Sequence, residues 1–202
     1  MFLKSQPLLV LATTSVYRRR LLERLGLRFA VAAPQVDECA YSGESALALV
    51  TRLARAKAAS IAAASPGCWV IGSDQIAVLG VGGPTERLLG KPGTAARCVE
   101  QLLSCSGQTV VYLTAVALLR HEDAASTGFV DTTQVRFRSL DEETIGRYVE
   151  RESPLDCAGG FKVEGLGIAL CETIDSSDPS ALIGLPLIRL AAALRGVGFQ
   201  IP

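Results

Sequence analysis

The sequence predicts an α/β fold built around a mixed β-sheet. Three patterns in its 202 residues lead to this class. Short continuous apolar runs, such as residues 8–12, are typical of strands that are buried on both faces. Helical stretches with one apolar face alternate with these runs. Two strand-like segments, residues 109–119 and 129–137, are joined by a polar turn over residues 121–128, which indicates an antiparallel pair.

In the first half of the chain, the sequence predicts two short strands, two helices and one longer strand. The first strand leads into a helix over residues 18–26, which ends at a glycine. A second strand over residues 29–33 follows, and residues 44–64 form a long Ala-rich helix. Residues 69–79 form a strand whose middle is interrupted by Gly-Ser-Asp-Gln.

The second half continues the same alternation. A helix over residues 95–104 follows a Gly-Lys-Pro loop, and Asp141 caps a further helix that has acidic residues in its first turn. The Gly-rich segment 157–174 is a loop that feeds a strand, and residues 185–194 form the last helix. We expect one domain over residues 1–202.

The composition argues against nucleic acid and membranes as binding partners. Twenty Lys and Arg balance twenty Asp and Glu, so the chain has no overall basic field for nucleic acid or an anionic membrane surface. No apolar run approaches the roughly 20 residues of a membrane-spanning helix. We therefore expect a protein without nucleic-acid or membrane partners. A homodimer is compatible with the sequence.

The six cysteines are scattered and form no Cys-x-x-Cys pair. Disulfide-rich scaffolds are usually much shorter, so we interpret the cysteines as reduced thiols, mostly in the core, of a cytoplasmic protein. The chain has a single histidine, His121, in a charged turn, which speaks against a zinc site.

Two basic side chains fall on the apolar faces of predicted helices. At 100° per residue, Arg18 shares a stripe with the leucines of the first helix, and Lys57 lies in the middle of the apolar face of the Ala-rich helix. Arg52 and Arg55 lie on the far side of that helix. Lys57 either covers apolar surface and extends its ammonium to water, or holds the ammonium toward an enclosed anion. The second arrangement requires a partner, because burying an unpaired charge costs several kcal/mol.

Asp74 lies in an otherwise apolar strand, where an unpaired carboxylate is equally costly. One interpretation is a structural salt bridge, with Lys57 as a candidate partner. The other is a carboxylate that faces a ligand crevice, as strand-end acids do in α/β sheets.

Together with Glu38, which follows another acid, and Lys91 in the Gly-Lys-Pro loop, these residues suit a phosphate and divalent-metal site. Carboxylate oxygens bind Mg²⁺ or Mn²⁺, and Arg and Lys neutralise phosphate oxygens. The Thr-Thr-Ser turn at residues 13–15 adds hydroxyls and helix-start amides that suit an anion. The motif GxxxxGK[ST] is absent, so the chain has no Walker P-loop. The motifs GxSxG and HExxH are also absent, which argues against acyl transfer by a Ser-His pair and against zinc hydrolysis.

Four segments in this order resemble the Maf family of nucleoside triphosphate pyrophosphatases: LATTSVYRRRLLERLG, VDE at 36–38, GSDQ with LGKP, and CAGGFKVEGLG at 157–167. The branch that acts on 7-methylguanosine triphosphate is the most similar, through GSDQ and the CAG-x-FK-x-EG loop. The resemblance implies a two-lobed Maf/ITPase-like fold around an elongated mixed sheet with flanking helices and an active-site cleft between the lobes. It also implies cleavage between the α and β phosphates, giving a nucleoside monophosphate and pyrophosphate.

By match to the family motifs, Asp74 is the expected catalytic proton acceptor, and the expected metal ligands are Glu38 and Asp74, for Mg²⁺ or Mn²⁺. Nine positions carry the expected site: Ser15, Arg18, Lys57 and Lys91 for phosphate, Glu38 and Asp74 for metal, and Tyr17, Gln75 and Glu164 for base choice.

One of the three positions expected to set the base preference departs from the family. Tyr17 stands where the methylguanosine branch has Trp and the pyrimidine branch has Arg. An aromatic face and an acid such as Glu164 suit a positively charged 7-methylguanine, through cation–π contact and acceptance of its N–H groups. Glu164 has a structural alternative, an ion pair with Lys162 two residues away. Two alternative functions stay open: a dTTP or UTP pyrophosphatase, and a non-catalytic nucleotide-binding regulator of cell division.

Overall fold

The strands form one seven-stranded sheet in the order β2-β1-β3-β5-β6-β7, with β4 paired to β3 outside this path. The computed structural model describes residues 7–83, 86–121 and 125–202. β1 pairs in parallel with β2 and β3, whereas β4 is antiparallel to β3 and β7 is antiparallel to β6. The strands are β1 (Leu8–Ala12), β2 (Ala30–Ala32), β3 (Cys68–Leu79), β4 (Arg87–Leu89), β5 (Thr109–Arg120), β6 (Ala125–Phe137) and β7 (Cys171–Ser176). The predicted mixed sheet is confirmed.

Polar side chains start four of the five α-helices that lie in the described residues. Ser15, Ser45, Thr94 and Asp141 each accept a hydrogen bond from the backbone N–H three residues later, which satisfies a helix-start amide. The α-helices are α1 (Val16–Glu23), α2 (Ala46–Ala62), α3 (Ala95–Cys105), α4 (Glu142–Glu152) and α5 (Leu187–Gly196), and two short 3₁₀ turns are η1 (Ala158–Gly160) and η2 (Leu166–Leu170). The cap predicted at Asp141 is confirmed.

The predicted elements are all present, most of them with shifted ends. α1 begins two residues before the predicted start, because Ser15 caps it. The strand predicted over residues 69–79 is confirmed as β3, and its extended backbone is continuous through Gly-Ser-Asp-Gln, where the apolar pattern is interrupted. β4 was not predicted, since its three residues are too few to show a period. In the predicted turn over residues 121–128, residues 122–124 lie outside the described ones.

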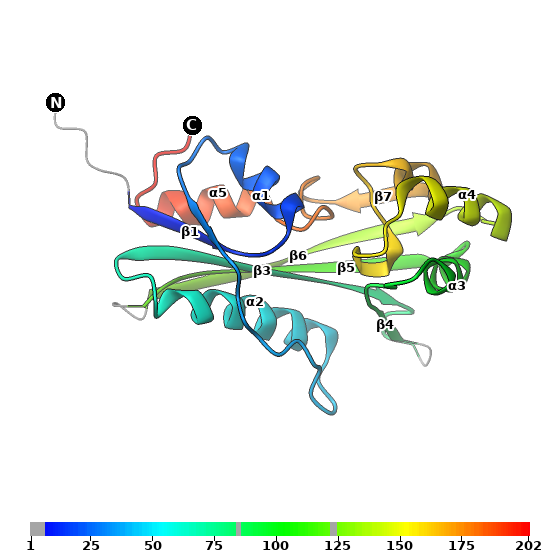
Figure 1. Ribbon diagram of the computed structural model, residues 1–202, viewed down its shortest axis with the longest axis horizontal. Helices are drawn as coiled ribbons and strands as arrows, with labels where there is room; N and C mark the ends of the chain where they lie inside the picture. The colour runs from blue at the N-terminus through cyan, green and yellow to red at the C-terminus, as the bar shows by residue number, and fades with distance from the viewer. Residues whose placement is uncertain (1–6, 84–85, 122–124) are drawn as a thin grey trace. The chain divides into compact units, whose positions relative to one another are not determined.

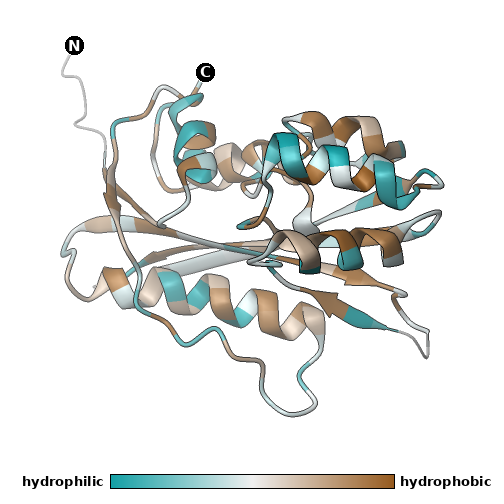
Figure 2. Cartoon of the chain, turned by 45° about the vertical axis from the view of Figure 1, so that its right-hand side comes forward, coloured by the Kyte–Doolittle hydropathy of each residue, from teal (hydrophilic) through white to brown (hydrophobic). Residues whose placement is uncertain are grey.

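The chain divides into two compact units, and the long strands β3, β5 and β6 contribute to both. Unit 1 consists of Met1–Asp74, Thr114–Asp131 and Gly184–Pro202. Within it, α2 covers one face of the strands, and α1 and α5 lie on the other (Figure 1). One core cluster in unit 1 is made of small side chains, which lets α2 approach the strands closely: Val10, Ala12, Ala58, Ala62 and Val70. Figure 2 shows the mixed hydrophobic and hydrophilic residues along α2 that this one-sided burial requires.

Unit 2 consists of Gln75–Leu113 and Thr132–Ile183. Its core contains aromatic rings, with the ring centroid of Phe161 5.2 Å from that of Phe137 and 6.0 Å from that of Tyr112. The buried Tyr148 hydroxyl accepts from the Lys162 N–H at 3.0 Å, which fixes the Gly-rich segment at α4. The prediction of one domain over residues 1–202 stays a prediction.

All six cysteines are free thiols. Only Cys98 and Cys105 are fully buried, and Cys39 is exposed, so the expectation that most of them lie in the core is wrong. None of the helices in the described part of the chain is long and apolar enough to cross a membrane.

Candidate active site

The site in unit 1 is built on a close contact between α2 and β3. Gly72 faces α2, and a Cβ added to it would lie 2.2 Å from the carbonyl oxygen of Ala54 and 2.5 Å from the backbone nitrogen of Ala58. Only glycine therefore permits this packing. Successive side chains of a strand point to opposite faces, so Asp74, two residues further on, also faces α2. Lys57 lies between the two helix residues that touch Gly72, which places its side chain beside Asp74.

Lys57 joins two carboxylates. Its Nζ donates to Asp74 Oδ1 at 2.6 Å and lies 2.6 Å from Glu38 Oε1. The Lys57 and Asp74 side chains are 9% and 10% exposed, whereas that of Glu38, on the connection between β2 and α2, is 56% exposed. The interpretation of Lys57 as a side chain that extends its ammonium to water is therefore wrong. The salt bridge named as an alternative for Asp74 is present, and Glu38 shares it.

Arg18, in α1, is anchored close to the part of β3 that carries Asp74. Its Nε donates to the Gly184 carbonyl at 2.9 Å, and Ser73 Oγ donates to that carbonyl at 3.0 Å. Burial lowers the pKa of Arg18, and the nearby charges of Asp74 and Glu38 oppose that shift. Ser73 directly precedes Asp74 in β3, so the carbonyl that Arg18 and Ser73 both contact places Arg18 near the Lys57–Asp74 pair within unit 1.

The turn before α1 has the geometry of a helix cap. Ser15 Oγ accepts from the Arg18 N–H at 3.4 Å, and the Ser15 N–H donates to Thr13 Oγ1 at 3.0 Å. Tyr17, in the first turn of α1, is half-buried. Helix-start amides and hydroxyls at this position suit an anion next to Arg18.

The donor set suits a hard divalent cation that is shared with a ligand. In the described residues, no group of three or more His, Cys, Asp and Glu side chains is placed to hold a metal ion. Asp74 and Glu38 supply two carboxylates, which is the number that Mg²⁺ commonly takes from a protein when phosphate oxygens and water complete its shell. The residues fit a phosphate-bridged Mg²⁺ or Mn²⁺ better than a metal held by the protein alone.

Three predicted site residues belong to unit 2. Gln75 Nε2 donates to the carbonyls of Ala181 and Leu182, both at 3.0 Å, so both N–H groups of its amide are used. Lys91 and Glu164 are exposed. Lys162 lies 2.6 Å from Glu152, which gives it an ion-pair partner other than the predicted Glu164.

Three residues that support this site were missed by sequence reasoning. The Gly184 carbonyl accepts from Arg18, and Ser73 donates to the same oxygen. Arg52, placed by periodicity on the far side of its helix, contacts the segment that carries Glu38. The Gly184 φ of 121° lies in the region that favours glycine, but nothing in the sequence indicates its partner 166 residues away.

Comparisons with known proteins show the family of the chain and support its fold. A family model described as Maf-like protein matches residues 8–197. A relative from Xanthomonas oryzae pv. oryzae, named 7-methyl-GTP pyrophosphatase, is 51% identical over 196 residues, covering 97% of this chain and 100% of the relative. A relative of the same name from Xanthomonas axonopodis pv. citri is 53% identical, with coverage of 97% and 100%.

Among solved structures, the Ham1 protein of Staphylococcus aureus superimposes with a TM-score of 0.51 at 13% identity, covering 94% of this chain and 98% of that one. This similarity supports the mixed α/β fold. The family match over nearly the whole chain shows that the protein belongs to the Maf family.

Proposed function

We propose that this protein is a nucleoside triphosphate pyrophosphatase that hydrolyses the α–β phosphoanhydride of 7-methyl-GTP to the nucleoside monophosphate and pyrophosphate. The observation that carries the proposal is the buried Lys57–Asp74 pair with Glu38 and Arg18 beside it. It occurs in a chain that is 51% identical, over almost its full length, to a relative named 7-methyl-GTP pyrophosphatase.

In this proposal Asp74 accepts a proton from a water molecule, whose oxygen attacks the α-phosphorus. The bond from the α-phosphorus to the bridging oxygen breaks, and pyrophosphate leaves with that oxygen. Lys57 and Arg18 neutralise the charge that builds on the leaving group, and Ser15 holds a phosphate oxygen with the first amides of α1. Fixed positive groups in a partly enclosed site stabilise such charge more than the same groups in water.

Asp74 and Glu38 would hold the Mg²⁺ or Mn²⁺. The ion, when bound, supplies charge neutralisation of the phosphates and acidification of coordinated water. Lys57 contacts both carboxylates, so its ammonium would share them with the cation and could also neutralise a phosphate oxygen.

For the base, we propose that Tyr17 stacks on the methylated purine, whose positive charge an aromatic face attracts. The roles of Gln75, Lys91 and Glu164 stay predictions.

The test is a nucleotide panel. Purified protein with Mg²⁺ or Mn²⁺ is given 7-methyl-GTP, GTP, UTP and dTTP, and pyrophosphate release is measured. We expect the highest kcat/KM with 7-methyl-GTP. A clear preference for UTP or dTTP would reverse the choice of substrate, and no release from any triphosphate would favour a nucleotide-binding regulator.

A further inference from the structure

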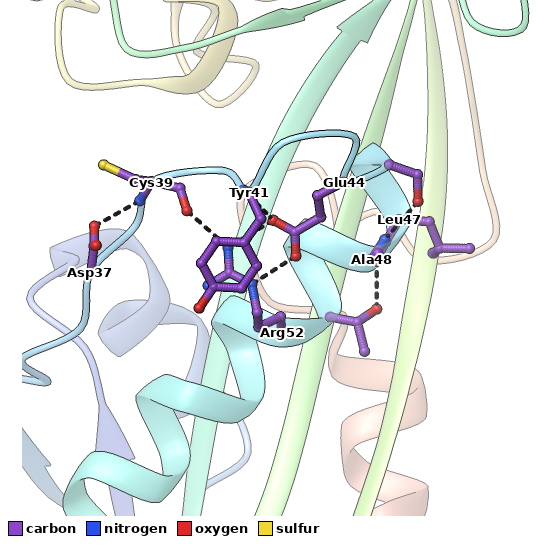
Figure 3. Close-up of polar contacts among 9 residues, drawn as sticks. Asp37, Cys39, Tyr41, Glu44, Leu47, Ala48 and Arg52 are labelled. Carbon is purple, nitrogen blue, oxygen red and sulfur yellow. Dashed lines mark hydrogen bonds and ion pairs between the residues drawn. The ribbon is translucent and has the colours of Figure 1, made fainter.

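The segment between β2 and α2 carries Glu38, and one arginine of α2 holds it. Figure 3 shows Arg52 reaching from α2 to this segment, with Tyr41 and Glu44 around its guanidinium. Arg52 Nε and Nη2 donate to the two oxygens of Glu44 at 2.7 and 2.8 Å. This is the two-point geometry that a guanidinium provides and an ammonium does not.

The same guanidinium makes two further contacts. Arg52 Nη2 donates to the carbonyl of Cys39, the residue directly after Glu38, at 2.9 Å. The guanidinium carbon of Arg52 lies 3.9 Å from the ring centroid of Tyr41, within cation–π range. Glu44 also accepts from the Tyr41 N–H at 3.0 Å. We call Tyr41, Glu44 and Arg52 the clamp.

The clamp is more than a solvated surface ion pair. The side chains of Arg52 and Glu44 are 24% and 8% exposed. Hydrogen bonds from Arg52, against the opposing effect of burial, lower the pKa of Glu44 to about 2. The Asp37 carboxylate accepts from the Cys39 N–H at 3.0 Å, so a local hydrogen bond spans Glu38.

We propose that Arg52 is a positioning residue for Glu38. α2 carries both Arg52 and Lys57, so one rigid helix holds the segment that bears Glu38 and the ammonium that Glu38 meets. The clamp thereby keeps the Glu38 carboxylate beside Asp74, ready for the divalent cation. This inference rests on the proposed function, because a metal–nucleotide complex is what Glu38 is held to receive.

The experiment compares Arg52→Met, which removes the charge and the hydrogen bonds, with Arg52→Lys, which keeps the charge but loses the two-point geometry. Arg55→Met is the matched control, because Arg55 is an exposed arginine one turn away on the same helix. Hydrogen exchange of the backbone amides of residues 37–41 is measured without metal or nucleotide. The Mg²⁺ concentration for half-maximal pyrophosphate release from 7-methyl-GTP and the kcat at saturating Mg²⁺ are measured as well.

For Arg52→Met we expect amide exchange over residues 37–41 to rise about tenfold and the half-saturating Mg²⁺ concentration to rise about tenfold, because the competent segment conformation becomes a minor one. The kcat at saturating Mg²⁺ stays within about threefold of the starting protein, because excess cation recovers that conformation. For amide exchange and for the half-saturating Mg²⁺ concentration, Arg52→Lys should give values between those of Arg52→Met and the starting protein. Arg55→Met should give the values of the starting protein. A role in stability alone would lower Tm and leave the Mg²⁺ dependence unchanged.

Equal Mg²⁺ dependence in Arg52→Met and Arg55→Met would overturn the inference. If the starting protein releases no pyrophosphate, the proposed function fails, while unchanged exchange over residues 37–41 would separately refute the clamp. Should Arg52→Met not fold, Tyr41→Leu removes the stacking but leaves the ion pair, and we expect it to shift both readouts by about threefold in the same direction.

Discussion

The backbone of Gly72 in β3 touches α2 so closely that a Cβ on it would lie 2.2 Å from the carbonyl oxygen of Ala54. This contact sets the distance between the strand that carries Asp74 and the helix that carries Lys57. A single missing side chain in the core therefore determines the geometry of the charged pair.

Gly72→Ala should lower the free energy of unfolding by about 1–3 kcal/mol, because the new methyl group forces α2 away from β3. Urea unfolding measures this loss. Gly146→Ala in α4 is the matched control: a Cβ there meets nothing within 4 Å, so alanine should stabilise the helix by about 0.5–1 kcal/mol. Equal stability of Gly72→Ala and the starting protein would show that α2 can move without cost.

Lys57→Met should destabilise the metal-free protein by about 3–5 kcal/mol, because it leaves Asp74 buried opposite Glu38 without the cation that joins them. Asp74→Asn should cost less than about 2 kcal/mol, since Lys57 keeps Glu38 as a partner and the amide oxygen can still accept. Urea unfolding in the presence of a chelator compares the two. The reverse order of stabilities would contradict this account of the pair.

Asp74→Asn should reduce turnover by about 10²–10⁴-fold, the usual contribution of a general base, with little change in nucleotide affinity. Pyrophosphate release gives kcat, and calorimetry with a non-hydrolysable α,β-methylene nucleotide gives Kd. Retained turnover would remove Asp74 from the role of base.

Gly184→Ala should weaken binding of the same analogue about tenfold or more. Its φ of 121° strains any other residue, and its Cβ would lie 3.3 Å from Arg18 Nε, which displaces the guanidinium from the carbonyl that holds it. Gly198→Ala is the matched control, because Gly198 has a φ of 97° in the same unit and its Cβ would meet only Pro7, at 3.9 Å. If both variants lose stability but neither loses affinity, the Gly184 carbonyl does not position Arg18.

The difference in Tm between the starting protein and Glu44→Gln should depend on pH. The folded-state pKa of Glu44 is lowered from its ordinary 4.5 to about 2, so the ionised carboxylate stabilises the fold fully above the ordinary value. That contribution is lost as the pH falls from 4.5 toward 2. Thermal unfolding should therefore show a constant difference above about pH 5 and a shrinking one below. A difference that persists unchanged at low pH would contradict the ionic role of Glu44.

Periodicity in the sequence predicts on which face of a helix a side chain lies. This was enough to predict that the Lys57 side chain points inward. Lys57 falls on the apolar face of α2, and the structure confirms that it is buried there. The strand over residues 8–12 was predicted with its observed ends, because its apolar run is bounded by a proline and by small polar residues.

Contacts made by irregular segments could not be predicted in this way. Arg52 lies on the outer side of α2 by periodicity, yet the segment over residues 33–45 folds back over that side and half-buries it. The carbonyl of Gly184 likewise carries no sequence signal, since every residue has one. The sequence therefore did not predict the contacts that depend on backbone geometry, whereas it did predict the positions that follow from the pattern of side chains.

The position of Lys57 has a practical consequence for handling the protein. The Lys57 ammonium already pairs with both carboxylates when no metal ion is bound. The folded state therefore does not depend on an added ion, in contrast to that of a zinc finger. Purification and storage in EDTA should leave an intact starting material, to which Mg²⁺ or Mn²⁺ is then returned in measured amounts.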